Sequence, residues 1–164
     1  IDTAIKGLEN DKANSEDLTS LEQTVTEHLA ETKKWIGAST TQAQTILSGV
    51  ETDLRWDTFY NVNGADFVSI IDDKLVLEKG VYIFWAQTEF IANGNGQRRF
   101  GVAGFNNHGI SDTAYDTTIT VNYVINVTES NYFLPCKVYQ DSGGSLNLKS
   151  GYSVIRILKV GDLD

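Results

Sequence analysis

Few side chains in this sequence have the types and spacing needed for catalysis. Lys149-Ser-Gly151 resembles one element of a penicillin-interacting enzyme, but no Ser-x-x-Lys partner accompanies it. Gly94-Asn-Gly96 resembles a phosphate-binding loop, yet we expect no helix after it whose amides could hold an anion. Cys136 lies in an apolar segment, which predicts a buried and unreactive thiol. Because no pair of catalytic carboxylates can be identified either, we expect a protein that is not an enzyme.

The polar segment 106–117 has a composition that suits ligand binding rather than catalysis. Amide and carboxylate groups hydrogen-bond sugar hydroxyls, and an aromatic ring offers a flat surface on which a pyranose can stack. Loops on a rigid β scaffold often carry binding residues, and this is the longest connection that we expect in the β-rich part of the chain. The candidate ligand-binding residues are Asn106, Asn107, His108, Asp112, Tyr115 and Asp116. A merely solvated loop is the alternative.

Metal and cofactor sites are not predicted. Two His and one Cys supply too few ligands for an ordinary zinc site. Asp72 and Asp73, together with Asp112 and Asp116, offer oxygen ligands for calcium, but their spacing matches no EF-hand loop. We therefore interpret these acids as solvated turn residues and expect no metal and no cofactor.

The composition excludes several partners. The 164 residues include 22 acidic and 13 basic side chains, a formal net charge of −9, whereas nucleic-acid binding requires clustered Lys and Arg. We therefore expect no nucleic-acid partner. No apolar run approaches the roughly 20 residues that span a bilayer, so we expect no membrane insertion either. The chain begins at Ile1 and contains no Met, which suggests a fragment of a longer protein.

A change of composition near residue 54 predicts two domains, a helical stalk at 1–53 and a β-rich head at 54–164. Residues 1–54 contain 10 acidic and 4 basic side chains but only one of the 17 aromatic residues, Trp35. Their apolar residues recur at helical and heptad spacing, which is typical of a coiled-coil-like seam. The seam residues are Leu18, Leu21, Val25, Leu29, Ile36, Ala43, Leu47, Val50 and Leu54. So thin a seam does not stabilise a lone helix, so we expect self-association; a solvated tether is the alternative.

The remainder predicts an antiparallel sandwich of short strands. The expected strands are 74–78, 81–90, 99–105, 118–125, 133–140, 145–148 and 152–160, with a tight hairpin at Asn93-Gly-Asn-Gly96. Side chains alternate along a strand, yet the segment 81–86 is apolar on both of its faces, as is 152–160. One face can fill the core of the head, and we expect a second copy of the chain to cover the other.

The strand segment Lys74-Leu-Val-Leu-Glu-Lys-Gly-Val-Tyr-Ile-Phe84 resembles the glycine and aromatic-x-aromatic strand of tumour-necrosis-factor (TNF) and complement-one-q globular heads. The segments 132–140, 142–148 and 152–158 are similar to the closing strands of those heads. This resemblance covers roughly residues 55–160. It implies a mainly β, TNF-like jelly roll that follows a helical stalk and assembles as a homotrimer with apolar strand faces around the axis.

A helical stalk before such a head looks most like a bacteriophage tail fibre or receptor-binding protein. This resemblance implies an extracellular place in the virion, an upstream fibre or virion protein as partner, and a host-surface saccharide or protein as ligand. The candidate trimer-interface residues are Leu21, Val25, Leu29, Ile36, Leu47, Val50, Tyr82 and Phe84. The alternatives are a structural trimerisation or decoration module, a spore-surface or secreted complement-like head, and a fibre-borne depolymerase.

Overall fold

A computed structural model describes residues 18–27, 34–62, 64–92, 96–111 and 115–163 of the chain. The chain divides into two compact units, Ile1–Lys33 and Lys34–Asp164. In the first unit, a helix at 18–27 exposes Leu18, Leu21 and Val25 at the predicted spacing of three and four. Leu29, the next predicted seam residue, lies outside the described residues. Among the residues described, no helix has the length and apolarity needed to cross a membrane.

The second unit, the head, consists of strands and turns. Its strands are β1 (Trp35–Ser39), β2 (Thr45–Ile46), β3 (Thr52–Asp53), β4 (Thr58–Val62), β5 (Val68–Ile71), β6 (Lys74–Leu77), β7 (Gly80–Phe90), β8 (Gly96–Val102), β9 (Phe105–Ser111), β10 (Thr117–Val127), β11 (Tyr132–Phe133), β12 (Cys136–Gln140), β13 (Leu146–Asn147) and β14 (Val154–Gly161). All ladders between these strands are antiparallel. The sequence prediction of an antiparallel β head is confirmed.

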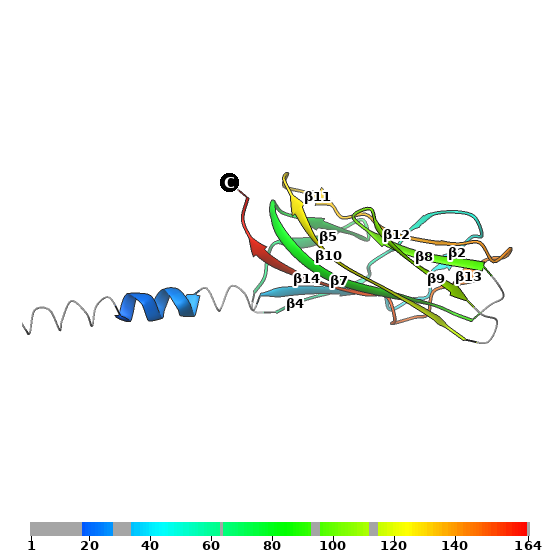
Figure 1. Ribbon diagram of the computed structural model, residues 1–164, viewed down its shortest axis with the longest axis horizontal. Coiled ribbons are helices and arrows are strands. Elements are labelled where there is room, and N and C mark those ends of the chain that lie inside the picture. Colours follow the sequence, from blue (N-terminus) through cyan, green and yellow to red (C-terminus); the bar gives the residue numbers. More distant parts are fainter. Residues whose placement is uncertain (1–17, 28–33, 63, 93–95, 112–114, 164) are drawn as a thin grey trace, which may run out of the picture. The chain divides into compact units, whose positions relative to one another are not determined.

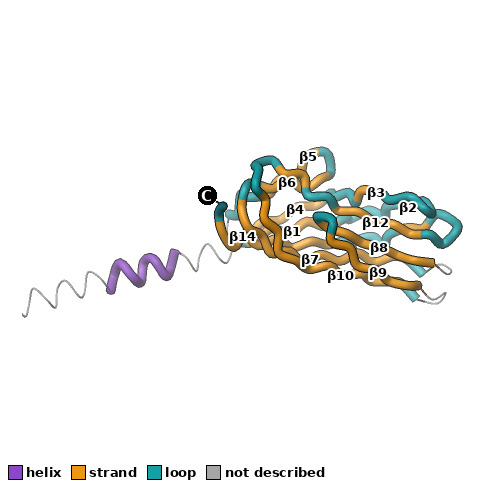
Figure 2. The backbone as a smooth tube through the Cα atoms, turned by 45° about the horizontal axis from the view of Figure 1, so that its top comes forward, coloured by secondary structure: helices purple, strands orange, loops and turns teal. Residues whose placement is uncertain are grey.

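The strands form two layers around one core (Figures 1 and 2). The first layer is a five-stranded sheet with the order β10-β7-β14-β1-β4. Shorter sheets lie opposite, with the orders β3-β12-β8-β9, β11-β6-β5 and β13-β2. Side chains from both layers, among them Phe84, Ile155, Phe100 and Val138, are buried between them. The core therefore takes one face of each layer and leaves the other face of each layer outside.

The predicted helix beyond residue 34 is wrong, and so is the predicted domain boundary at residue 54. Residues 35–53 contain β1, β2 and β3, and the head unit begins at Lys34. β1 lies between β14 and β4, with Ile36 directly opposite Ile157 and Asn61. Pairing on both sides with distant strands overrides a local apolar spacing that suits a helix. Ile36 is fully buried in the core of its own chain, so it is not a candidate for the trimer interface.

Strand β7 has the two apolar faces that the sequence predicted, but the candidate interface residues lie on the inner one. Tyr82 and Phe84 are 0% and 1% exposed, and both belong to the core. The Tyr82 hydroxyl donates to the backbone carbonyl of Glu78 at 2.8 Å. Ile83, between them, is 43% exposed on the outer face. Alternation reveals that a strand has two apolar faces but not which face the core occupies, which is why Tyr82 and Phe84 were misassigned.

Two predicted connections also differ in the structure. The expected hairpin at 93–96 is wrong, because β7 pairs with β10 and β14 whereas β8 pairs with β12 and β9. The strands β7 and β8 therefore belong to different sheets, and residues 93–95 between them lie outside the described residues. The first half of the expected loop at 106–117 belongs to strand β9, which pairs along its whole length with β8. Residues 103–104 make the turn between β8 and β9, with Ala103 at φ 52° and Gly104 at φ 84°.

Candidate functional site

The outer face of the five-stranded sheet carries a continuous apolar row. The antiparallel registers place Val124 opposite Ile83, Ile83 opposite Leu158, Leu158 opposite Trp35, and Trp35 opposite Val62. Because directly opposite residues project from the same face, one apolar side chain from each of the five strands joins this row. Val124 is 58% exposed, Ile83 is 43% exposed, and the other three are half-buried. We call this row and its aromatic neighbours the apolar outer face.

Aromatic rings and one arginine form the next row of the apolar outer face. The Arg156 guanidinium lies 5.5 Å from the ring centre of Trp35 and 5.8 Å from that of Trp85. Trp35 and Tyr60 meet edge to face, with their ring centres 5.8 Å apart. The Tyr60 ring crosses Gly37, where any Cβ would overlap it. A glycine at this position therefore allows the ring to lie flat on the sheet.

This face ends in a polar cluster at the far end of β7. Lys149 Nζ contacts Glu89 Oε1 at 2.5 Å and Asp116 Oδ2 at 2.8 Å, and it lies 4.3 Å from the ring centre of Tyr152. The Lys149 side chain and the backbone amide of Ala92 both donate to Asp116, and they hold the pKa of Asp116 below its ordinary value. The hydrogen bonds of Lys149 to Asp116 and Glu89 raise the pKa of Lys149. These groups hold the 115–116 turn against the sheet, so the cluster is structural.

The structure does not bring the predicted ligand-binding residues together. Asn106 and His108 alternate with Asn107 along β9, so they project from opposite faces of the strand. The Asn107 amide donates to the backbone carbonyl of Thr120 at 2.8 Å, and Asp116 accepts the bonds from Lys149 and Ala92. Tyr115 is 77% exposed.

Asp112, the sixth predicted ligand-binding residue, lies outside the described residues. Asn107 and Asp116 thus use side-chain groups that were predicted to bind a ligand for hydrogen bonds within the chain. The predicted ligand-binding residues do not form one site, and their role stays a prediction.

Leu47 and Val50, two further candidate interface residues, lie in the head. They are 58% and 47% exposed, between β2 and β3 rather than on a helix. The residues that sequence reasoning missed are Trp35, Tyr60, Trp85 and Arg156 on the apolar outer face. Trp35 was the only aromatic residue before residue 55, which was a usable signal, but the helix prediction concealed that it belongs to a strand.

Cys136 is buried, as the sequence predicted. Burial raises the pKa of its thiol to about 12, so the nucleophilic thiolate does not form at neutral pH. Within the described ranges, no group of three or more His, Cys, Asp or Glu residues is arranged to hold a metal ion.

No protein-family model matches the chain, and no curated protein resembles it in sequence. Solved structures do resemble it. A crystal structure of murine APRIL at pH 5.0 matches with a TM-score of 0.60 and 9% identity, over 77% of this chain and 98% of that one. The Eiger TNF from S. frugiperda matches with a TM-score of 0.50 and 10% identity, over 80% and 94% of the two chains. The PRD1 vertex protein P5 matches with a TM-score of 0.52 and 16% identity, over 79% and 98%.

The head has the TNF-like jelly-roll fold. The matched structures include a TNF protein and a vertex protein, and both support the predicted fold. At 9–16% identity, this likeness concerns the arrangement of strands and not the side chains of any site. The function of this TNF-like head must therefore be argued from its own surfaces.

Proposed function

We propose that the chain is the non-enzymatic, homotrimeric head of a phage fibre or receptor-binding protein, and that it attaches the virion to a host-surface ligand, in particular a saccharide. The apolar outer face carries this proposal. It joins side chains from five strands in one uninterrupted row and includes Trp35, Trp85 and Arg156. Trp, Tyr and Arg dominate the binding energy of protein interfaces, and a large exposed apolar patch marks an interaction surface.

A second copy of the chain fits this face better than a soluble ligand does. The row runs across the whole sheet, from the β10 edge to the β4 edge. In a closed ring of three copies, one part of each copy's surface contacts a different part of the next copy. Each copy therefore needs two apolar contact areas, and a row that is apolar from one sheet edge to the other can supply both. The choice of a trimer over a dimer rests on the likeness to TNF-like heads.

The helix at 18–27 supports the same assembly. Its exposed Leu18, Leu21 and Val25 form an apolar stripe with the spacing of a coiled-coil seam. We propose that three such stripes pack together as a stalk upstream of the head. Three equivalent heads would then act at once on a cell surface, so that weak individual contacts give a high avidity. The likeness to a vertex protein supports a place in the virion.

A structural role without a ligand is the second candidate. The matched PRD1 protein is named for its position at a vertex and not for a ligand, which favours a head that caps or decorates a particle. The two candidates share the trimer and differ only in attachment.

Sedimentation and competition test the proposal in turn. The full chain at micromolar concentration should sediment at about three times its 18.1 kDa mass. The double variant Ile83→Asp/Leu158→Asp should sediment as a folded monomer, because two carboxylates replace the centre of the apolar row. Ile71→Asp is the matched control, because Ile71 is 45% exposed but lies on β5, outside the five-stranded sheet, and it should leave the trimer intact. A compact wild-type monomer would refute the trimer.

Attachment is tested separately. The trimer should compete with intact particles for host cells. Absence of competition by a verified trimer would leave the structural role.

A further inference from the structure

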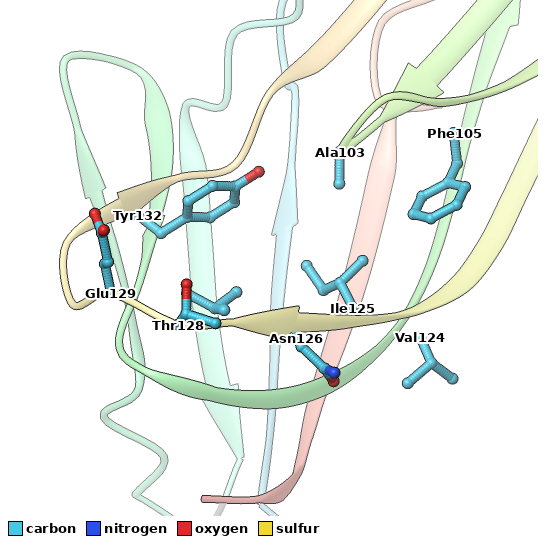
Figure 3. A pocket seen from close by; sticks show the side chains of 9 residues that line it. Ala103, Phe105, Val124, Ile125, Asn126, Thr128, Glu129 and Tyr132 are labelled. Atoms are coloured by element: carbon cyan, nitrogen blue, oxygen red, sulfur yellow. The ribbon is translucent and has the colours of Figure 1, made fainter. Parts of the chain in front are cut away.

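A groove opens along the side of the head where β10 and β9 form the edges of the two layers. It has a volume of about 410 Å³ and lies between Ala103 and Phe105 at the β8–β9 turn, the end of β10, and Tyr132 of β11 (Figure 3). Ligand pockets typically enclose about 300–1,000 Å³, so a small molecule or one unit of a polymer fits the space. Buried Ile125 and Val127 form the floor, and β10 is the last strand of its sheet.

One wall of the groove carries the Phe105 ring, and Tyr123, which is not among the lining residues, packs against that ring. The rings of Phe105 and Tyr123 stack with their centres 4.0 Å apart and their planes at 16°. The Tyr123 ring also packs against buried Phe84, with the two centres 6.5 Å apart. Phe105 and Tyr123 nevertheless remain 39% and 42% exposed. In Figure 3, the Phe105 ring and the Ile125 side chain face the same space.

Polar groups without partners border the apolar floor. In the part of the chain that the structure describes, the side chains of Thr128, Glu129 and Tyr132 make no hydrogen bond or ion pair. Figure 3 shows the Tyr132 hydroxyl directed into the groove towards Ala103. Asn126 lies at the rim, on the opposite side of β10 from Ile125. The groove thus offers two hydroxyls and a carboxylate, whereas Asn107 and Asp116 of the predicted site are bonded within the chain.

We propose that this groove binds one pyranose unit of a neutral saccharide. An apolar ring face could stack on the Phe105 ring, while sugar hydroxyls pair with the hydroxyls of Tyr132 and Thr128 and the carboxylate of Glu129. No basic side chain lines the groove, which disfavours phosphate and other anions. Glu129 is the only carboxylate among the lining residues, whereas glycoside hydrolysis ordinarily needs two, so the groove binds without cleaving. This inference rests on the proposed attachment function and gives it a location.

Saturation-transfer NMR on the full chain provides the test, with the methyl glycosides of glucose, galactose, N-acetylglucosamine and rhamnose as probes. At least one of them should bind, and in amide correlation spectra of the protein it should shift the resonances of Thr128 and Tyr132. Tyr132→Phe removes a single hydroxyl and should weaken that binding about fivefold. Phe105→Ala should weaken it at least as much, and if that variant does not fold, Tyr132→Phe decides. Tyr115→Ala is the control, because this exposed tyrosine belongs to the predicted loop and should leave binding unchanged.

Three outcomes overturn the proposal. The first is that none of the four glycosides binds. The second is that binding is lost in Tyr115→Ala but kept in Tyr132→Phe and Phe105→Ala. The third is that the assembled protein shields Tyr132 from a soluble paramagnetic probe, which would show that a neighbouring copy covers the groove.

Failure of the inference can be told apart from failure of the proposed function. If trimers of Phe105→Ala compete for host cells as well as the wild type does, the groove is not the site but the attachment function stands. If the wild-type chain neither assembles nor competes, the proposed function fails. The glycoside-binding experiment would then still show whether the groove binds a saccharide.

Discussion

The outer faces of the two layers of the head have opposite characters. On the five-stranded sheet, Arg156 is held between Trp35 and Trp85 within a broad apolar row. On the β3-β12-β8-β9 sheet, Glu51 pairs with Arg99 at 2.8 Å and with Lys137 at 3.2 Å. Lys74 and Lys137 both pair with Asp53, so this second face, the charged outer face, is covered by an ion-pair network.

The difference indicates which face needs a partner. An antiparallel sheet ordinarily has one face on the core and one in water, and the charged outer face follows that rule. The apolar outer face does not, and its exposed side chains gain free energy only when another surface covers them.

The largest expected effect is a loss of folding stability when a side chain on the inner face of β7 is removed. Phe84→Ala should lower the free energy of unfolding by about 3–5 kcal/mol, because it leaves a cavity where a buried ring packed. Ile83→Ala, one residue away on the apolar outer face, should cost much less within one head. Urea denaturation at two protein concentrations checks both. Equal losses at both positions would mean that the apolar outer face is part of a core.

Matched glycine substitutions compare the two outer faces directly. A Cβ at Gly37 would overlap the Tyr60 ring on the apolar outer face, and a Cβ at Gly101 would overlap the Asn106 side chain on the charged outer face. Displacing an interface aromatic costs about 2 kcal/mol or more, so Gly37→Ala should weaken self-association more than tenfold. Gly101→Ala should leave the sedimentation of the assembly unchanged. Weakened assembly in both variants would contradict the assignment of the interface to one layer.

Removing an ion pair should have a smaller effect. Glu51→Gln breaks the pairs with Arg99 and Lys137, which are exposed to solvent and therefore contribute about 0–1 kcal/mol to the free energy of unfolding. High salt should reduce even this difference from the wild type. Sedimentation should show an intact trimer, and dissociation of Glu51→Gln would instead place the charged outer face in the interface.

The smallest effect is expected where the apolar outer face ends, at Asp116. Lys149 and the Ala92 amide lower the pKa of Asp116 in the folded state, so its contribution to stability is present above the ordinary value of 3.8. That contribution is lost as the pH falls below 3.8 and through the lowered pKa. Asp116→Asn should therefore be slightly less stable than the wild type at neutral pH. The difference should disappear in acid, as thermal unfolding across pH would show; a difference that persists at low pH would contradict the role of this carboxylate.

Sequence reasoning located most strands after residue 74, because short apolar runs bounded by turn residues carry a local signal, but it assigned the polar strand β9 to a loop. It placed the boundary of the head incorrectly because Ile36 and Leu54 also satisfy a heptad spacing. Their burial in strands and turns of the head depends on partners far along the chain, such as Ile157 opposite Ile36. For the same reason, sequence proximity grouped Asn106, Asn107 and Asp116 into one site that strand pairing separates.

The sequence by itself determined that β7 and β14 are apolar on both faces, that Cys136 is buried, and that the head is an antiparallel β sandwich. Only the tertiary structure decided that Tyr82 and Phe84 face the core, that Trp35 belongs to a strand, and that Phe105 and Tyr132 border one groove. The physical reason is that alternation has a period of two along one strand and is local. Which face is covered, and which side chains become neighbours, is set by pairing between strands that the chain separates widely.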